Sequence, residues 1–223
     1  MPRSLQFKGT CDGCRVVLGR MAMHRHLDQC VKLAPVKKSG LVKRLRIAVD
    51  APYASPYWII VDAHPNATLK ELDDFLRELW LECCGHLSSF HVGKQGYALD
   101  PIEEFDDRDL GVRISDVLLT GTIARYEYDF GSTTELRIRA GKTVIGPKSG
   151  EHIRLLAQNE APIILCESCK KPATVICAEC TMERTSGARC GRCRKRGHEC
   201  EDALWFDILN SPRTATCGYG GNW

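Results

Sequence analysis

The chain has 223 residues, of which 43% are hydrophobic and 26% charged, and these ordinary values exclude wholesale disorder and a collagen-like fibre. No apolar run approaches the roughly 18 residues of a membrane span, and the first residues lack the apolar segment of a secretory signal, so we expect a cytoplasmic protein with no membrane contact. The 13 cysteines are the unusual component, because in a reducing compartment so many thiols indicate metal ligands rather than disulfides.

The charge is unevenly distributed along the chain, although the net charge is only +3. Residues 1–46 contain 11 Lys or Arg and 2 Asp or Glu, whereas residues 47–165 contain 11 and 19. A basic front segment followed by an acidic middle indicates an anionic partner for the front segment.

The first predicted domain is a zinc finger at residues 1–34. A Cys-x2-Cys turn presents two thiolates, and a His and a Cys four residues apart lie on one face of a helix, so four ligands can surround zinc tetrahedrally. We favour His26 as the histidine ligand, and His24 is the alternative. The predicted ligands are Cys11, Cys14, His26 and Cys30.

A basic linker, residues 35–40, follows the finger. Lys and Arg around a single finger favour contacts with the phosphates of a nucleic acid, DNA or RNA. Two other interpretations stay open, because basic side chains are often only solvated and single fingers also bind proteins. The candidate nucleic-acid contacts are Arg15, Arg20, Arg25, Lys37, Lys38, Lys43, Arg44 and Arg46.

The second predicted domain, residues 41–160, combines strands with one long helix. Residues 41–49 and 57–61 alternate or cluster apolar residues on either side of a Pro/Ser turn, which predicts a hairpin. Thr68 and Glu71 form a capping box at the start of the helix. The helix has an apolar stripe and ends near a glycine. The stripe and its end are Leu69, Leu72, Leu76, Leu79, Cys83 and Gly85.

Further strands are predicted at residues 89–92, near 97, at 122–128 and at 135–139, with a turn at 114–119. Tyr126 and Tyr128 lie on one strand face, which we take to be the core face. The order of hairpin, capped helix, short strands and late strand is that of a β-grasp. We therefore predict an α+β protein with a β-grasp (ubiquitin-like) central domain between small zinc-binding modules.

Three strings of this domain resemble a known family: His86-Leu with Phe90 and Val-Gly93, Ser115-Asp-Val-Leu-Leu119, and Tyr126-x-Tyr-Asp-Phe-Gly131. They look like the plasmid pRiA4b Orf-3-like family, whose members are also described as passenger proteins of insertion elements. The resemblance covers roughly residues 41–217. It implies an α+β domain, a mobile-element setting and no established activity. The chain departs from the family pattern at Ser132-Thr-Thr134.

The last predicted domain, residues 161–223, is a two-zinc module with a C-terminal tail. Three Cys-x2-Cys knuckles and a His-x-Cys provide eight ligands, enough for two closed tetrahedral sites. The knuckles can pair in an interlocked cross-brace or sequentially, and Cys217 is an alternative to the last ligand. The predicted ligands are Cys166, Cys169, Cys177, Cys180, Cys190, Cys193, His198 and Cys200.

Twelve ligands at four per ion predict about three structural Zn²⁺ ions. No nucleophile with a base at motif spacing is present, so we expect a non-catalytic zinc protein of a mobile-element or defence-associated system. It would bind nucleic acid through the basic finger and a protein partner through the ubiquitin-like domain. The alternatives are a pure protein-interaction adaptor and a metal-dependent enzyme that uses the acidic loop, residues 100–109.

Overall fold

The computed structural model describes residues 8–33, 40–53, 56–101, 104, 106–183, 187–200 and 203–221. The chain divides into two compact units. Unit 1 comprises Met1–Leu76 and Leu87–Glu160, and unit 2 comprises Arg77–His86 and Ala161–Trp223. This division differs from the domain limits expected from the sequence, since the finger segment falls in unit 1 and residues 77–86 fall with the C-terminal module.

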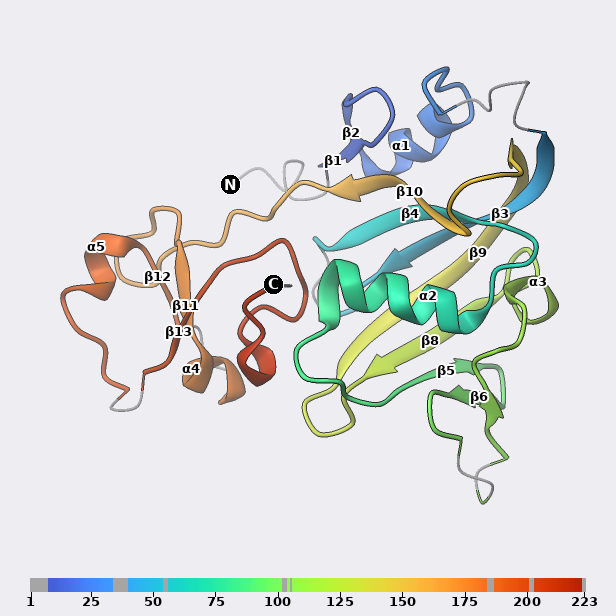
Figure 1. Ribbon diagram of the computed structural model, residues 1–223. Coiled ribbons are helices and arrows are strands. Elements are labelled where there is room, and N and C mark those ends of the chain that lie inside the picture. The colour runs from blue at the N-terminus through green and yellow to red at the C-terminus, as the bar shows by residue number, and fades with distance from the viewer. Residues whose placement is uncertain are drawn as a thin grey trace. The chain divides into compact units, whose positions relative to one another are not determined.

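Unit 1 is built on one ten-stranded sheet in which neighbouring strands run antiparallel, except for the parallel pair β6 and β7 (Figure 1). Its strands, in spatial order, are β2 (Val17–Gly19), β1 (Lys8–Cys11), β10 (Ile153–Asn159), β4 (Trp58–Ala63), β3 (Leu41–Asp50), β9 (Thr134–Pro147), β8 (Ile123–Tyr128), β5 (Ser88–Val92), β6 (Gln95–Ala98) and β7 (Arg108–Asp109). The fold is therefore mixed α+β with mostly strands. The finer expectation of a β-grasp stays a prediction.

Several local predictions are confirmed in this unit. The predicted hairpin is the antiparallel pair β3 and β4. Helix α2 (Leu69–Leu76) starts at the predicted capping box: the Thr68 backbone N–H donates to Glu71 Oε2 at 2.8 Å, and the Glu71 N–H donates to Thr68 Oγ1 at 3.2 Å. Tyr126 and Tyr128 are completely buried, as their alternation along β8 predicts. The predicted turn near residue 114 is the short helix α3 (Ile114–Val117).

The predicted apolar stripe is wrong at its C-terminal end. After Leu76 the helix changes to a π-helical turn, η2 (Arg77–Leu81), which holds an extra residue per turn and rotates the following side chains. Trp80 and Leu81 are therefore buried, while Leu79 is only half-buried. Cys83 lies beyond the helix and is not part of its core face.

The finger segment shares a core with the sheet. Strand β1 pairs with β10 in the register Gly9↔Asn159, and helix α1 (Arg20–Leu27) follows β2. Met23 and Leu27 of α1 belong to one buried cluster with Trp58, Ile60, Leu156 and Ala157. The sheet residues of this cluster come from β4 and β10, so the finger is anchored on the larger fold.

Gly9 is the closest point of this anchoring, and Gly9→Ala is expected to weaken it. A Cβ at residue 9 would lie 2.4 Å from the carbonyl oxygen of Gln158 and 2.6 Å from the Trp58 ring. Such overpacking typically costs about 1–3 kcal/mol of the free energy of unfolding, measured by denaturant titration. Gly19→Ala is the matched control, because a Cβ there meets nothing within 4 Å. An unchanged midpoint for Gly9→Ala would contradict this packing.

Unit 2 has a three-stranded sheet in the order β12 (Ala188–Arg189), β11 (Val175–Cys177) and β13 (Trp205–Asp207). Besides η2, its described helices are short: α4 (Ala178–Met182), α5 (Gly191–Arg194) and the 3-10 turn η4 (Thr216–Gly218). None of the helices in the described parts of the chain is both long and apolar enough to cross a membrane.

Candidate metal centres and basic surface

The structure brings the four predicted finger ligands together. Cys11 ends β1, Cys14 lies in the following turn, and His26 is in the last turn of α1. The Sγ atoms of Cys11 and Cys30 are 3.7 Å apart, and Cys14 Sγ lies 3.2 Å from His26 Nε2. The four ligand atoms lie within 4.8 Å of one another. This donor set and spacing suit a closed tetrahedral zinc site.

The alternative ligand, His24, lies outside this group. It lines a neighbouring cavity together with Arg20, Arg46 and Arg139. Burial lowers the pKa of His24 below its ordinary value, and the positive charge of Arg20 lowers it further. His24 is therefore part of a cationic surface rather than of the finger cluster.

Unit 2 holds two interlocked clusters. Along the chain the cysteine pairs alternate between the clusters, which is the cross-brace arrangement. Sulfur atoms of Cys169 and Cys190 are 3.7 Å apart in the first, and Cys180 Sγ lies 3.1 Å from His198 Nε2 in the second. The clusters are Cys166, Cys169, Cys190 and Cys193, and then Cys177, Cys180, His198 and Cys200.

Local structure explains how unit 2 presents these thiolates. Cys177 ends β11 and precedes α4, so Cys177 and Cys180 lie on the two sides of one tight turn. Gly187 closes against this turn: a Cβ there would lie 2.7 Å from Cys180 Cβ and 2.9 Å from Cys177 Cβ. Only glycine allows this approach without a shift of the knuckle.

A fourth cluster consists of Cys83, Cys84, His86 and Cys217, all in unit 2. Sequence reasoning missed it because the cluster lacks a Cys-x2-Cys knuckle and its last member lies 131 positions after His86. The open alternative that Cys217 completes the second module site is corrected, since Cys200 occupies that position. All 13 cysteines belong to the four clusters, and each cluster could hold a zinc ion, one more than the three predicted.

The predicted nucleic-acid contacts differ in their positions and exposure. Lys37 and Lys38 lie outside the described residues. Arg15 pairs with Asp12 on the surface, and Arg25 and Lys43 are exposed. The prediction that Arg44 contacts nucleic acid is wrong, because its side chain is 1% exposed and its Nε lies 2.5 Å from Asp62 Oδ1. Arg44 is therefore a structural residue inside unit 1.

Arg20 and Arg46 belong instead to a larger cationic surface around α1, β3, β9 and β10, which we call the basic surface. Exposure of its side chains rises from 8% at Arg46 to 59% at Lys142. Its six cations share three carboxylates, Asp28, Asp50 and Asp62. The basic surface comprises Arg20, Arg46, Arg137, Arg139, Lys142 and Arg154.

Around Asp50, positive side chains outnumber negative ones. It contacts Arg137 at 2.6 Å and Arg20 at 3.1 Å, and it also contacts Arg139. Burial alone would raise the pKa of Asp50, but the hydrogen bond from Arg137 and the charges of Arg20 and Arg139 outweigh it, so the pKa lies below its ordinary value. Asp50 is therefore ionised at neutral pH, and three arginines still face a single negative charge.

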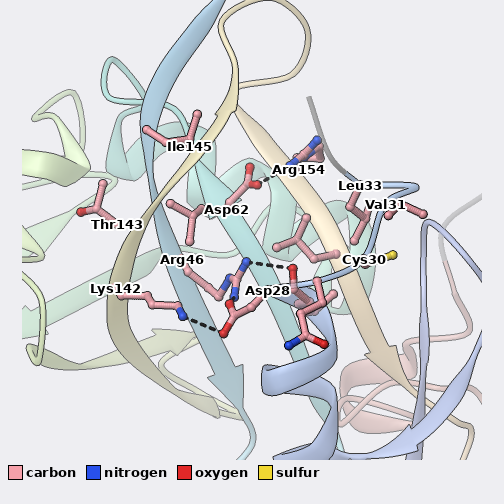
Figure 2. A pocket seen from close by; sticks show the side chains of 14 residues that line it. Asp28, Cys30, Val31, Leu33, Arg46, Asp62, Lys142, Thr143, Ile145 and Arg154 are labelled. Carbon is pink, nitrogen blue, oxygen red and sulfur yellow. Dashed lines mark hydrogen bonds and ion pairs between the residues drawn. The ribbon is translucent and has the colours of Figure 1, made fainter. Parts of the chain in front are cut away.

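A cavity of 410 Å³ lies between the end of the finger and the sheet. Figure 2 shows Asp28 contacting both Arg46 and Lys142, and Arg154 contacting Asp62. Val31 and Leu33 of the finger segment also line this cavity. A second cavity of 680 Å³ is lined by Arg20, Arg46, Arg139 and Lys142, with the exposed Met21. The basic surface is thus hollowed and can surround an anionic group from several sides.

Among its described residues, the acidic loop at 100–109 contains no group with metal-ligand spacing. In the described parts of the chain, the groups with metal-ligand spacing consist of Cys and His, and the described acidic residues of this loop are not among them. Glu103 lies outside the described residues.

These features define a mixed α+β protein with four Cys/His clusters suited to zinc. No family model and no curated protein matches the chain, so the resemblance to the pRiA4b Orf-3-like family stays a prediction. Among solved structures it is similar to the protein of unknown function MM3350 from Methanosarcina mazei Go1. The two share 17% sequence identity with a TM-score of 0.43, and the match covers 53% of this chain and 68% of that one.

Proposed function

We propose that this protein is a non-catalytic zinc protein that binds nucleic acid through its basic surface. The carrying observation is that six cations from α1, β3, β9 and β10 share only three carboxylates on one hollowed face. Excess positive charge at a concave surface attracts phosphates, whose binding releases counterions. Zinc is structural in this proposal, because clusters of four protein ligands leave no open coordination position for water.

The finger has a supporting role in this function. Its ligands hold α1, which carries Arg20, and its last turn places Asp28 between Arg46 and Lys142. The finger thereby shapes the basic surface and does not act as an independent base-recognition module. The surface borders β8, where Glu127 lies opposite Glu135 and Arg125 lies opposite Arg137 in the ladder. Arg125 pairs with Glu127, so positive and negative side chains alternate at this border.

The proposed surface presents mainly charge, so we expect phosphate contacts with little base preference. Replacing Arg137, Arg139 and Lys142 together with Gln should weaken binding and flatten its salt dependence. Each lost contact to a duplex reduces the magnitude of the negative slope of log K against log salt by about 0.9. Fluorescence anisotropy of labelled duplex DNA and single-stranded RNA, from about 50 to 200 mM salt, measures both quantities and separates the two ligands.

A matched triple variant controls for the loss of charge. Lys94, Arg108 and Arg113 are exposed cations of the same unit that lie outside the basic surface. Replacing them with Gln removes the same charge and should leave the salt slope unchanged. Equal losses in both variants would show a diffuse charge effect and contradict the basic surface. A parent chain that binds neither nucleic acid would favour the protein-interaction adaptor.

Two finer parts of the expected function rest on the sequence alone. Docking of a protein partner through a ubiquitin-like domain depends on the β-grasp interpretation. Association with mobile elements or defence depends on the resemblance to the pRiA4b Orf-3-like family. Both are compatible with a nucleic-acid-binding zinc protein and are tested separately, by pull-down from the native host with and without nuclease.

A further inference from the structure

We propose that Cys83, Cys84, His86 and Cys217 bind a fourth zinc ion, which joins the segment after η2 to the C-terminal tail and is the first of the four to exchange. The first three ligands lie within four consecutive residues directly after the π-helical turn. Cys217 lies in η4, near the end of the chain. A metal at this point would connect parts of unit 2 that are otherwise far apart in sequence.

The donor spacing fits zinc. With Zn–S bonds of about 2.3 Å, two sulfurs of a tetrahedral site lie about 3.8 Å apart. The Sγ of Cys84 lies 3.6 Å from that of Cys83 and 4.0 Å from that of Cys217. His86 Nε2 is 3.0 Å from Cys84 Sγ and 3.3 Å from Cys217 Sγ. The finger and module clusters show the same spacings, 3.7 Å between sulfurs and 3.1–3.2 Å between sulfur and nitrogen.

The surroundings suit the charge of such a centre. Three thiolates around Zn²⁺ leave one net negative charge, and Nη2 of the completely buried Arg213 lies 3.5 Å from Cys83 Sγ. Arg213 is held in place by the tail itself, since its backbone N–H donates to Ser211 Oγ at 2.9 Å. Ser211 Oγ in turn donates to the carbonyl oxygen of Trp80 in η2 at 2.7 Å. Charged and hydrogen-bonded neighbours of this kind typically orient metal ligands.

The backbone at Cys217 also needs an explanation. Cys217 has φ 49° and ψ 35°, a left-handed conformation that is unfavourable for a residue with a side chain. Ala215 and Gly218 also have positive φ, so three of four consecutive residues are left-handed. Such conformations persist where surrounding contacts fix them, and a zinc–thiolate bond at Cys217 supplies that contact.

Exposure distinguishes this centre from the others. None of its four ligands is buried, whereas each of the other three clusters has two buried cysteines. A chelator or competing thiol can therefore reach this metal at two exposed ligands, Cys84 and Cys217, whereas the finger and the first module cluster each expose one cysteine and the second module cluster exposes none. We infer that the fourth zinc leaves before the other three.

Elemental analysis of the full chain, purified without chelator, tests the site. We expect four zinc ions in the parent and three in both Cys217→Ser and His86→Ala. His91→Ala is the matched control, because His91 pairs with Glu127 and lies outside every cluster, and it should keep four. Three ions in the parent, with no further loss in the two site variants, would overturn the proposal.

Competition with a coloured chelator tests the order of exchange. The parent and His91→Ala should release one equivalent of zinc in a fast phase, and Cys217→Ser should lack this phase. If Cys217→Ser retains a fast equivalent, the exchangeable metal is elsewhere and the proposed order is wrong. His86→Ala guards against misfolding: a general collapse of unit 2 would release about three ions rather than one, and this result in both variants would refute a separate fourth site.

Discussion

Removing zinc from the full chain is expected to unfold unit 2 while strands β3, β4, β8 and β9 of unit 1 stay folded. Among the described residues of unit 2, the buried apolar side chains other than cysteine and alanine are those of Trp80, Leu81, Val175 and Tyr219. So small a core cannot offset the conformational entropy of the segment. Structural zinc supplies on the order of 10 kcal/mol of folding free energy per site. The free energy lost with all the ions of unit 2 therefore exceeds the free energy of unfolding of an ordinary domain.

Hydrogen exchange with and without a chelator measures this effect on the intact protein. Amides of β11 and β13 should lose their protection, and those of β3 and β9 should keep it. Cys193→Ser should reproduce the loss in unit 2, because the two module sites are interlocked. Ser168→Ala is the control, since Ser168 is exposed within a knuckle and belongs to none of the clusters. Protection of β11 that survives metal removal would contradict a zinc-dependent unit 2.

Asp62→Ala is expected to destabilise unit 1 strongly, although it leaves the metal ligands intact. Asp62 is completely buried and accepts from Arg44 Nε at 2.5 Å and from Arg154 Nη2 at 2.6 Å. Arg44 also donates to the carbonyl oxygens of Pro147, Glu151 and His152. Without Asp62 a buried guanidinium loses its counter-charge, which costs about 3–5 kcal/mol of the free energy of unfolding.

Two comparisons make this prediction specific. Asp28 also bridges two cations, but its side chain is 35% exposed, so Asp28→Ala should cost about 1 kcal/mol or less. Replacing Arg44 with Met and Asp62 with Leu together should recover much of the stability, because a buried ion pair often contributes little over apolar residues of similar volume. Denaturant titration measures all three variants. Equal costs for Asp28→Ala and Asp62→Ala would refute the dominance of the buried pair.

Local spacing explains which parts of the structure were predictable. The finger and module ligands follow Cys-x2-Cys and short His-to-Cys intervals, and each interval fixes neighbouring donors on one turn or helix. The capping box of Thr68 and Glu71 and the core face of Tyr126 and Tyr128 are likewise decided within a few residues. The structure confirms the capping box and the core face, and it brings the predicted ligands together in three clusters.

The features that were missed depend on contacts between distant residues. Pairing of β1 with β10 joins residues about 150 positions apart, and no local pattern marks it. The fourth cluster joins Cys84 and Cys217 across 133 positions. The π-helical turn was also missed: it changes the helical periodicity after Leu76, and Trp80 and Leu81 are buried while Leu79 is only half-buried. The buried position of Arg44 was hidden for the same reason, since its partner Asp62 lies on the neighbouring strand.

The place of the finger in the sheet has a consequence for solubility. Strand β10 is seven residues long, and without β1 one whole side of its backbone would present unpaired N–H and C=O groups to solvent. An open strand of this length is a template for pairing with another copy of the chain, and proteins usually cover or shorten such edges. Here the cover is itself short, because β1 has four residues and β2 three, and it ends at a zinc ligand, Cys11. A zinc ion bound by the finger ligands would therefore also limit self-association, and we expect a chain without this ion to expose the backbone edge of β10.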